Sequence, residues 1–291
     1  MQNREWNLID FHGKFLEDYM KWSVAHPEEA AREEDSDAHY YDMYADWLNT
    51  PKDWLGGVSP RGYFAEMQDA PMLVSAFMEY ILQEMEVPDP LVERLVAEAE
   101  AVYPIFLNIL MEDAPQEDIS PEELQQIRAE ILPLIGEMHK PHPYLRYIAL
   151  LEGQTEETAL AEELAEALSE AGTAYFPQML AAYARADGYA RMAFLDLFSR
   201  MPGEDKVFFL LRDALEEPDA DVAFLADCLG RLGDPRAVEA MKKVLYRPGL
   251  AYYQFKELKN AIEELSGEEL EEMDFSGDAL YEYLKEDHDA E

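Results

Sequence analysis

The sequence predicts an all-α protein, and three observations lead to this prediction. Apolar residues recur at steps of three and four, which is the period of one buried helical face. The segments with this period are bounded by Ser, Asp, Gly and Pro, the residue types that begin and end helices. No run of strand length alternates between apolar and polar residues, so a sheet is not expected.

The clearest helices of the N-terminal half are expected over residues 89–112 and 121–138. Each carries an apolar stripe at helical spacing. The second has the signals of a helix start, because Ser120 can act as its N-cap and Pro121 takes the first helical position, where a missing N–H costs nothing. We therefore expect an N-terminal helical bundle.

Residues 155–265 show self-similarity at a spacing of about thirty residues, the range in which repeat architectures occur. Each piece reads as a helix, a short turn containing Gly172, Gly203 or Gly233, and a second helix. In the third piece Gly233 can end one helix, and Pro235 sits at the start of the next. These features predict an α-solenoid, a stack of helix pairs that follows the bundle.

The run CLGRLGDPRAVEAMKKVL resembles a HEAT-like repeat of the phycobilisome-lyase type, in which Leu-Gly-Asp-Pro-Arg-Ala separates two helices. The resemblance is clearest over 219–247, weaker over 187–218 and faint over 156–186. It implies a curved stack of helix pairs with a protein-binding surface. It does not imply the lyase activity of some relatives, because no segment matches a chromophore site.

Residues 47–60, WLNTPKDWLGGVSP, are similar to the core of the toxin-binding domain of Xre/MbcA/ParS-type antitoxins, where this segment joins two helices of a small bundle. No helix-turn-helix DNA reader precedes it. Turn chemistry explains the same pattern: Pro51 ends a helix, Gly56 and Gly57 supply positive φ, and Pro60 begins the next helix. The segment is therefore either functional or only structural.

Three parts follow from these signals. Residues 1–153 form a helical bundle domain, residues 154–266 form HEAT-like repeats, and residues 267–291 form an acidic C-terminal cap or tail. In the tail, Phe275, Leu280 and Leu284 are expected to cover the last repeat, because the open end of a stack exposes its core.

The chain has 63 acidic and 23 basic residues and a formal net charge of −40, while 48% of its residues are hydrophobic. The apolar share is sufficient for a packed core, and the charge argues against binding to nucleic acid or an anionic membrane. No apolar run has the length of a membrane span, and the N-terminus lacks the apolar core of a signal peptide. The single Cys228 excludes a disulfide framework and favours the reducing cytoplasm.

The negative charge is not evenly distributed. Residues 201–262 carry 11 acids and 9 bases, whereas residues 263–291 carry 13 acids and one base, Lys285. Bases and aromatic residues in the near-neutral region are typical of a protein interface, so it is expected to bind an acidic or mixed-charge protein partner. Alternatively, its bases pair with the acidic tail or with acids four residues away on the same helix. The candidate partner-binding residues are Arg231, Arg236, Lys242, Lys243, Tyr246, Arg247, Tyr252 and Tyr253.

Three further groups have ordinary explanations beside chemical ones. Glu137, His139 and His142 could ligate a metal, but two prolines make this segment a stiff connector between helices. The carboxylates of residues 28–42 could bind calcium or magnesium, but they lack EF-hand spacing and are expected to form a solvated loop. Cys228 is expected to pack in the core. No catalytic residue, metal ligand or cofactor is assigned.

The preferred function is a non-enzymatic protein–protein interaction module, a cytosolic scaffold or adaptor. One alternative is a metal-dependent enzyme that uses the N-terminal carboxylates with His139 and His142. The other is an antitoxin-like regulator, or a regulator in which dense acidity mimics nucleic acid. The oligomeric state does not follow from the sequence.

Overall fold

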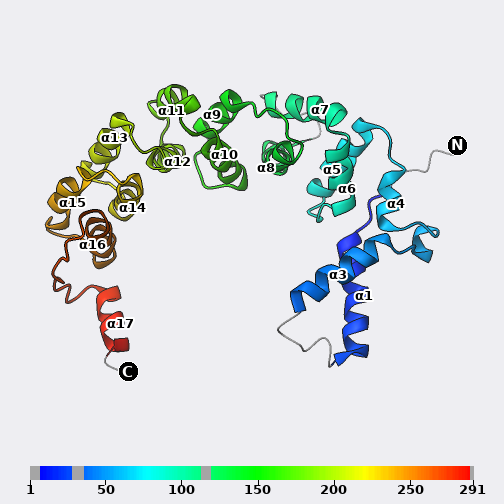
Figure 1. Cartoon of the computed structure of the whole chain (residues 1–291), viewed down its shortest axis with the longest axis horizontal. Coiled ribbons are helices and arrows are strands. Elements are labelled where there is room, and N and C mark those ends of the chain that lie inside the picture. Colours follow the sequence, from blue (N-terminus) through cyan, green and yellow to red (C-terminus); the bar gives the residue numbers. More distant parts are fainter. Residues whose placement is uncertain (1–6, 28–35, 113–118, 289–291) are drawn as a thin grey trace. The chain divides into compact units, whose positions relative to one another are not determined.

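The computed structural model describes residues 7–27, 36–112 and 119–288, and within these residues the fold is all-helical, as predicted (Figure 1). An isolated antiparallel bridge joins Lys52 and Val58. Contacts between residues divide the chain into two compact units, residues 1–146 (unit 1) and residues 147–291 (unit 2). The boundary expected at Gly153 lies at the end of the helix in which this division falls.

In unit 1, α5 packs against α6, α7 and α8, and α4 packs against α3 and α6. Aromatic rings join α1 to α3: the rings of Phe15 and Trp47 lie 5.7 Å apart, and Trp47 donates from Nε1 to Asp18 at 2.9 Å. The elements are α1 (Phe11–Ala25), α3 (Ser36–Asn49), the 3-10 helix η1 (Asp53–Leu55), α4 (Pro60–Ala65), α5 (Ala70–Leu82), α6 (Asp89–Ala97), α7 (Ala99–Met111), α8 (Pro121–Glu137) and the first residues of α9 (Tyr144–Glu152).

The start of α8 confirms the predicted helix signal. The Ser120 hydroxyl accepts from the Glu123 N–H at 3.1 Å, and the Glu123 carboxylate accepts from the Ser120 N–H at 2.7 Å. These reciprocal bonds satisfy two N–H groups that a helix start otherwise leaves unpaired. Both follow from residues three apart, which is why the sequence could predict them.

The prediction of a single helix over residues 89–112 is wrong in one respect, because the structure contains two helices there, α6 and α7. The backbone leaves the helical region at Glu98, where φ is −96° and ψ is 25°. Arg94 lies at this break and donates to the Met67 carbonyl at 3.1 Å and to the Glu98 carboxylate at 3.0 Å. The apolar stripe continues on both sides of the turn, so its period carries no sign of the break.

The loop between α3 and α4 has the predicted turn geometry. Gly56 and Gly57 have φ values of 72° and 80°, in the left-handed region that favours glycine. Pro60 begins α4, and the Ser59 hydroxyl caps that helix by accepting from the Gly62 N–H. Turn chemistry therefore accounts for the shape of residues 47–60.

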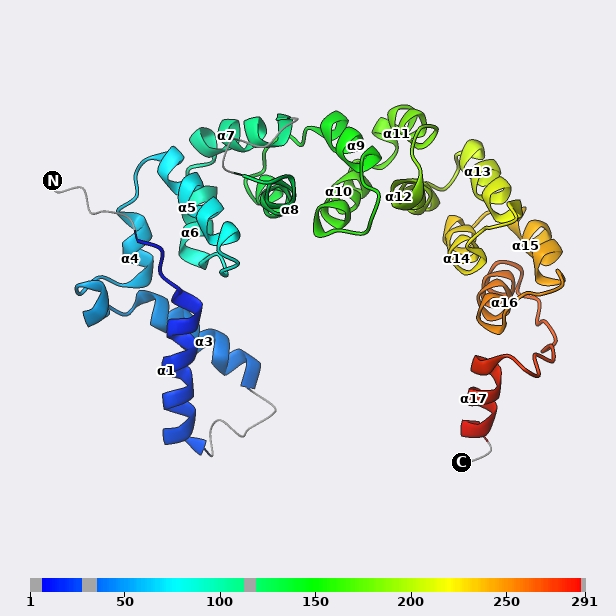
Figure 2. The same cartoon turned by 180° about the vertical axis from the view of Figure 1, so that it is seen from behind.

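In unit 2, alternate helices pack on one another (Figures 1 and 2). One row of helices consists of α10, α12, α14 and α16. The helices α11, α13 and α15 lie along one side of this row. The bounds are α10 (Ala159–Glu170), the 3-10 helix η2 (Gly172–Tyr175), α11 (Phe176–Tyr183), α12 (Gly188–Ser199), α13 (Asp205–Glu216), α14 (Val222–Leu232), α15 (Ala237–Leu245), α16 (Tyr252–Ser266) and α17 (Ala279–His288).

The glycines of the repeat turns have the conformation that the sequence suggested. Gly172, Gly203 and Gly233 have φ values of 56°, 91° and 73°. Each lies between the paired helices of its repeat-like segment, in a conformation that most other residues adopt only with strain. The three predicted helix–turn–helix segments are therefore present.

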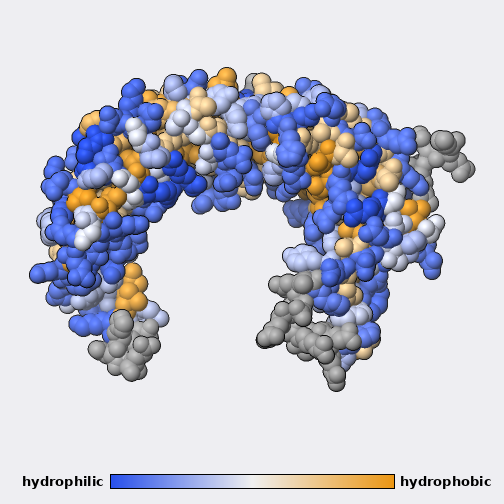
Figure 3. All heavy atoms as spheres, in the orientation of Figure 1, coloured by the Kyte–Doolittle hydropathy of each residue, from blue (hydrophilic) through white to orange (hydrophobic). Residues whose placement is uncertain are grey.

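On the face shown in Figure 3, hydrophobic residues form separate patches within a mostly hydrophilic surface. None of the helices in the described ranges combines the length and apolar character that crossing a membrane requires.

Candidate interaction surface

Arg231, one of the predicted partner-binding residues, joins two helices of the same row. Its guanidinium donates to Asp196 of α12 at 2.5 Å and also binds Asp227 on its own helix, α14. Nη1 also lies 3.3 Å from the Ser199 hydroxyl. The guanidinium of Arg231 therefore donates its hydrogen bonds to residues of unit 2, and it holds α12 and α14 together.

Arg236 joins the turn between α14 and α15 to the start of α13 in a similar way. Nη2 binds Asp234 at 2.6 Å and Asp205, at the start of α13, at 2.7 Å. The hydrogen bonds to Asp234 and Asp205 raise the pKa of Arg236. Its guanidinium also lies 4.4 Å from the centre of the Phe208 ring, within the range of a cation–π contact.

Lys242 and Tyr252 contact the acidic tail. We name residues 267–278, which connect α16 to α17 without regular helix, the strap. The Lys242 ammonium donates to Glu268 of the strap at 2.6 Å. The Tyr252 backbone N–H donates to Asp278 at 3.1 Å, and the Tyr252 ring lies 5.4 Å from that of Phe275.

The other four predicted residues are exposed. Lys243 lies in the last turn of α15, which ends at Leu245, and Tyr246 and Arg247 follow directly after the helix. Tyr246 is 65% exposed, and Tyr253 at the start of α16 is also exposed. Within the described part of the chain, neither Lys243 nor Arg247 forms an ion pair. We call Lys243, Tyr246 and Arg247 the open face of α15.

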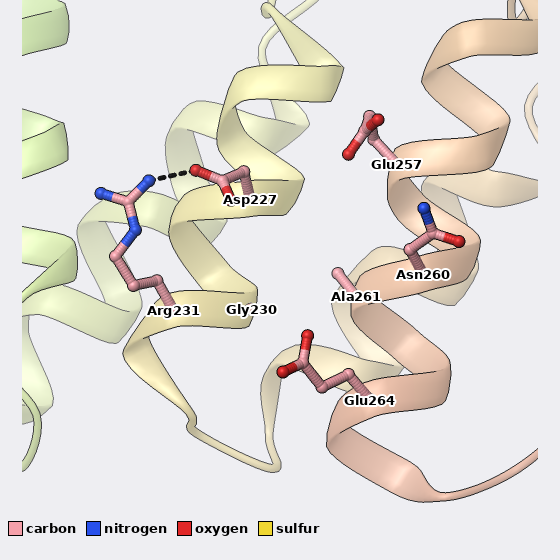
Figure 4. A pocket seen from close by; sticks show the side chains of 7 residues that line it. All are labelled: Asp227, Gly230, Arg231, Glu257, Asn260, Ala261 and Glu264. Carbon is pink, nitrogen blue, oxygen red and sulfur yellow. Dashed lines mark hydrogen bonds and ion pairs between the residues drawn. The ribbon is translucent and has the colours of Figure 1, made fainter. Parts of the chain in front are cut away.

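A shallow polar pocket of about 270 Å³ lies between α14 and α16 (Figure 4). Glu257 and Glu264 reach from α16 toward α14, with the Asn260 amide between them in sequence. The two helices approach closely at its floor, because a Cβ on Gly230 would lie 3.3 Å from that of Ala261. The pocket could take a cationic side chain, since its polar groups are carboxylates, an amide and an already paired arginine. Its lining residues are Asp227, Gly230, Arg231, Glu257, Asn260, Ala261 and Glu264.

The candidate metal residues do not form a ligand set. His139 follows α8 in the left-handed region with φ 52°, and the His142 ring stacks on Tyr144 with centroids 5.4 Å apart. Among residues whose positions the structure gives, no group of three or more His, Cys, Asp or Glu side chains could hold a metal ion. Residues 28–35 of the carboxylate-rich segment lie outside the described ranges.

Cys228 packs in the core of unit 2, as expected. Its side chain is buried, and burial raises the pKa of the thiol to about 12. A thiol in this state is a poor nucleophile at neutral pH because almost none of it is thiolate. The residue therefore serves packing.

The tail covers the end of unit 2 with a partly different set of residues from the one expected. Phe275 packs between the rings of Tyr252 and Phe255, at 5.4 Å and 5.0 Å. Leu280 and Leu284 instead remain exposed. Tyr281 contributes the second aromatic contact, 5.0 Å from the Tyr252 ring.

The aromatic and cationic cluster on α13 was not anticipated from the sequence. Phe209 is exposed, and the Arg212 guanidinium lies 4.9 Å from its ring centre. Because Phe208 fills the buried position beside it, Phe209 falls outside the apolar stripe of α13. An aromatic residue outside the stripe is the signal that could have indicated this exposed ring.

No protein-family model, curated protein or solved structure matches this chain. The resemblances to HEAT-like repeats and to the antitoxin domain therefore remain predictions.

Proposed function

We propose that the chain is a non-enzymatic interaction module and that unit 2 is a short α-solenoid of HEAT-like helix pairs that binds a protein partner. The packing of alternate helices and the glycine turns between paired helices support this architecture. In such stacks each helix pair extends a continuous surface, which suits the binding of another protein.

The observation that carries the proposal is the open face of α15. Most bases of the near-neutral region hold carboxylates of unit 2, as Arg231, Arg236 and Lys242 do. Lys243 and Arg247 flank the exposed Tyr246 without such a partner among the described residues. Arg and Tyr side chains dominate binding energy at protein interfaces. Two cations beside a tyrosine favour a partner that supplies carboxylates at this point.

The surroundings of the open face favour a partner of mixed charge. The chain as a whole carries a charge of −40, so a uniformly acidic protein would be repelled before contact. Screening at physiological salt limits this repulsion to about 8 Å, and short-range complementarity then decides the binding. A partner with acids opposite α15 and bases opposite Glu257 and Glu264 would match the charges of both sites.

The proposal is tested with the full chain immobilised and a lysate of cells that encode it. The double variant Lys243→Glu/Arg247→Glu is compared with wild type. Arg200 is unsuitable for a control variant, because it forms an internal ion pair with Asp196. The control is Lys206→Glu, which reverses one exposed charge with no ion pair among the described residues, and it is compared with Lys243→Glu and Arg247→Glu as single variants as well as with the double variant.

We expect the double variant to capture about one tenth or less of the amount of partner protein that wild type captures. A loss of this size is typical when charged residues at an interface are reversed. The captured protein is then purified, and its dissociation constant is measured against each variant. Equal affinity for wild type and the double variant would remove the open face from the proposal.

A further inference from the structure

The strap runs across the end of unit 2 and is fixed by its side chains. Gly267 ends α16 with φ 67°, and the chain then continues without regular helix until α17 (Figures 1 and 2). Contacts at four points hold it against α15 and α16. The four strap residues are Glu268, Glu272, Phe275 and Asp278.

The contacts combine carboxylates with one aromatic ring. Glu268 accepts from Lys242 at 2.6 Å, and Glu272 accepts from Lys259 at 2.6 Å. Farther along, the Phe275 ring packs against two rings of α16. This surface therefore fits an extended acidic segment with an aromatic anchor, and in the structure the strap is such a segment.

Lys259 favours a carboxylate at this surface. The residue is only 9% exposed, and its ammonium reaches Glu272 at 2.6 Å and Glu263 of its own helix at 3.7 Å. The hydrogen bond to Glu272 raises the pKa of Lys259, so the ammonium is charged. Removing a carboxylate from a buried ammonium is costly. Glu263 stays beside the ammonium when the strap leaves, and an acid on a replacing segment restores the closer contact that Glu272 makes.

The strap is also held in a way that permits replacement. The carboxylate-bearing side chains of Glu268 and Glu272 are 56% and 58% exposed, and ion pairs at such exposure are individually weak. Two other strap acids, Glu269 and Glu271, are exposed and contact no base among the described residues. Two of these strap acids pair with lysines and two do not, so changing the second pair is a matched control for changing the first.

We propose that the surface beneath the strap, formed by Lys242, Tyr252, Phe255 and Lys259, binds an acidic segment of a partner protein, and that the strap occupies this surface in cis. The partner segment carries two carboxylates and an aromatic ring with the spacing of Glu268, Glu272 and Phe275. This inference rests on the proposed function, because it names the kind of segment that the interaction module recognises. Lys242 of this surface and Lys243 of the open face are consecutive residues in the last turn of α15.

The test uses the full chain and a fluorescently labelled synthetic peptide, GEELEEMDFSGDALY, which copies residues 267–281. Binding is followed by fluorescence anisotropy. In wild type the tethered strap competes at an effective concentration in the millimolar range, so the peptide binds weakly. Glu268→Lys/Glu272→Lys weakens the strap and is expected to increase peptide affinity by about tenfold or more.

Glu269→Lys/Glu271→Lys is the control, because it makes the same change in net charge at positions without a basic partner. It is expected to bind the peptide as wild type does. A second variant, Phe275→Ala, removes the aromatic anchor without changing charge and is also expected to increase affinity. A peptide with lysine in place of both anchoring glutamates is expected not to bind any of the proteins.

Equal peptide affinity in wild type, Glu268→Lys/Glu272→Lys and Phe275→Ala would overturn the inference, as would an equal gain in the control variant. Circular dichroism confirms that each variant is folded. The proposed function fails separately, when Lys243→Glu/Arg247→Glu leaves partner affinity unchanged while the peptide results are as expected. If partner affinity depends on the open face but the strap variants have no effect, only the present inference fails.

Discussion

The two units use their basic side chains differently. In unit 1, Arg128 of α8 is 6% exposed and donates to the carbonyls of Ile109 and Glu112 at the end of α7. Arg146 donates to the carbonyl of Leu110 and to that of Glu112, both at 2.7 Å. Both guanidinium groups satisfy carbonyls that a helix end leaves without intrahelical partners.

In unit 2, basic side chains pair with carboxylates of neighbouring segments. Arg231 pairs with Asp196 across two helices, and Lys242 pairs with Glu268 of the strap. These groups are closer to solvent, and a carboxylate from another protein could take the place of the strap acid. The comparison indicates that Arg128 and Arg146 of unit 1 complete the fold by capping a helix end, whereas unit 2 has cations that can also take part in recognition.

The largest effect is expected for Arg128→Met in unit 1. The change removes the donors that Arg128 supplies to the buried end of α7, the carbonyls of Ile109 and Glu112, of which only Glu112 keeps Arg146, and we expect a loss of about 2–4 kcal/mol in the free energy of unfolding. Urea unfolding followed by tryptophan fluorescence reports on this unit, because all four tryptophans lie within its sequence. Arg61→Met, which removes an exposed pair with Glu93, is the control and is expected to cost about 0–1 kcal/mol. Equal losses would contradict the comparison.

A smaller effect is expected for Gly230→Leu in unit 2. The added side chain would meet Ala261 where α14 and α16 approach most closely, and overpacking of this kind costs about 1–3 kcal/mol. Cys228 provides the measurement, because its thiol reacts with a disulfide reagent only when unit 2 opens. We expect labelling to be about 5–150-fold faster, which is this cost expressed as a change in the opening equilibrium. Glu239→Leu, at an exposed position of α15, should leave the rate nearly unchanged; a similar rise in both variants would exclude packing at Gly230 as the cause.

The smallest effect concerns the pH dependence of unit 1. The hydrogen bond from Trp47 lowers the pKa of Asp18 in the folded state, so the carboxylate stabilises the fold above the unfolded pKa. This contribution is lost as the pH falls below about 4 and through the folded pKa. Asp18→Asn should therefore flatten the acid limb of the stability curve, measured by tryptophan fluorescence between about pH 5 and 2. An unchanged acid limb would show that the Trp47 bond does not favour the charged form.

Local structure could be predicted where neighbouring residues determine it. Ser120 and Glu123 lie three residues apart and cap the same helix, and Gly233 ends the helix that precedes it. The break at Glu98 could not be predicted, because the apolar period continues across it.

The surface was predictable only in part. Composition located the region rich in bases, but the pairing of Arg231 with Asp196 joins residues 35 positions apart and depends on how the helices pack. The sequence left two alternatives open for these bases: a protein partner, or internal pairing with the acidic tail or with acids four residues away, as Arg231 pairs with Asp227. The tail holds Lys242, while Lys243 and Arg247 remain exposed and unpaired within the described ranges.

The position of the strap at the end of a helix row has a mechanical consequence. Rows of this type fray from their ends, because a terminal helix has a neighbour on one side only. The strap lies over α16, where fraying of this row would begin. A partner that lifts it would expose the amides of α16 to exchange with solvent, unless the incoming segment seals the same edge.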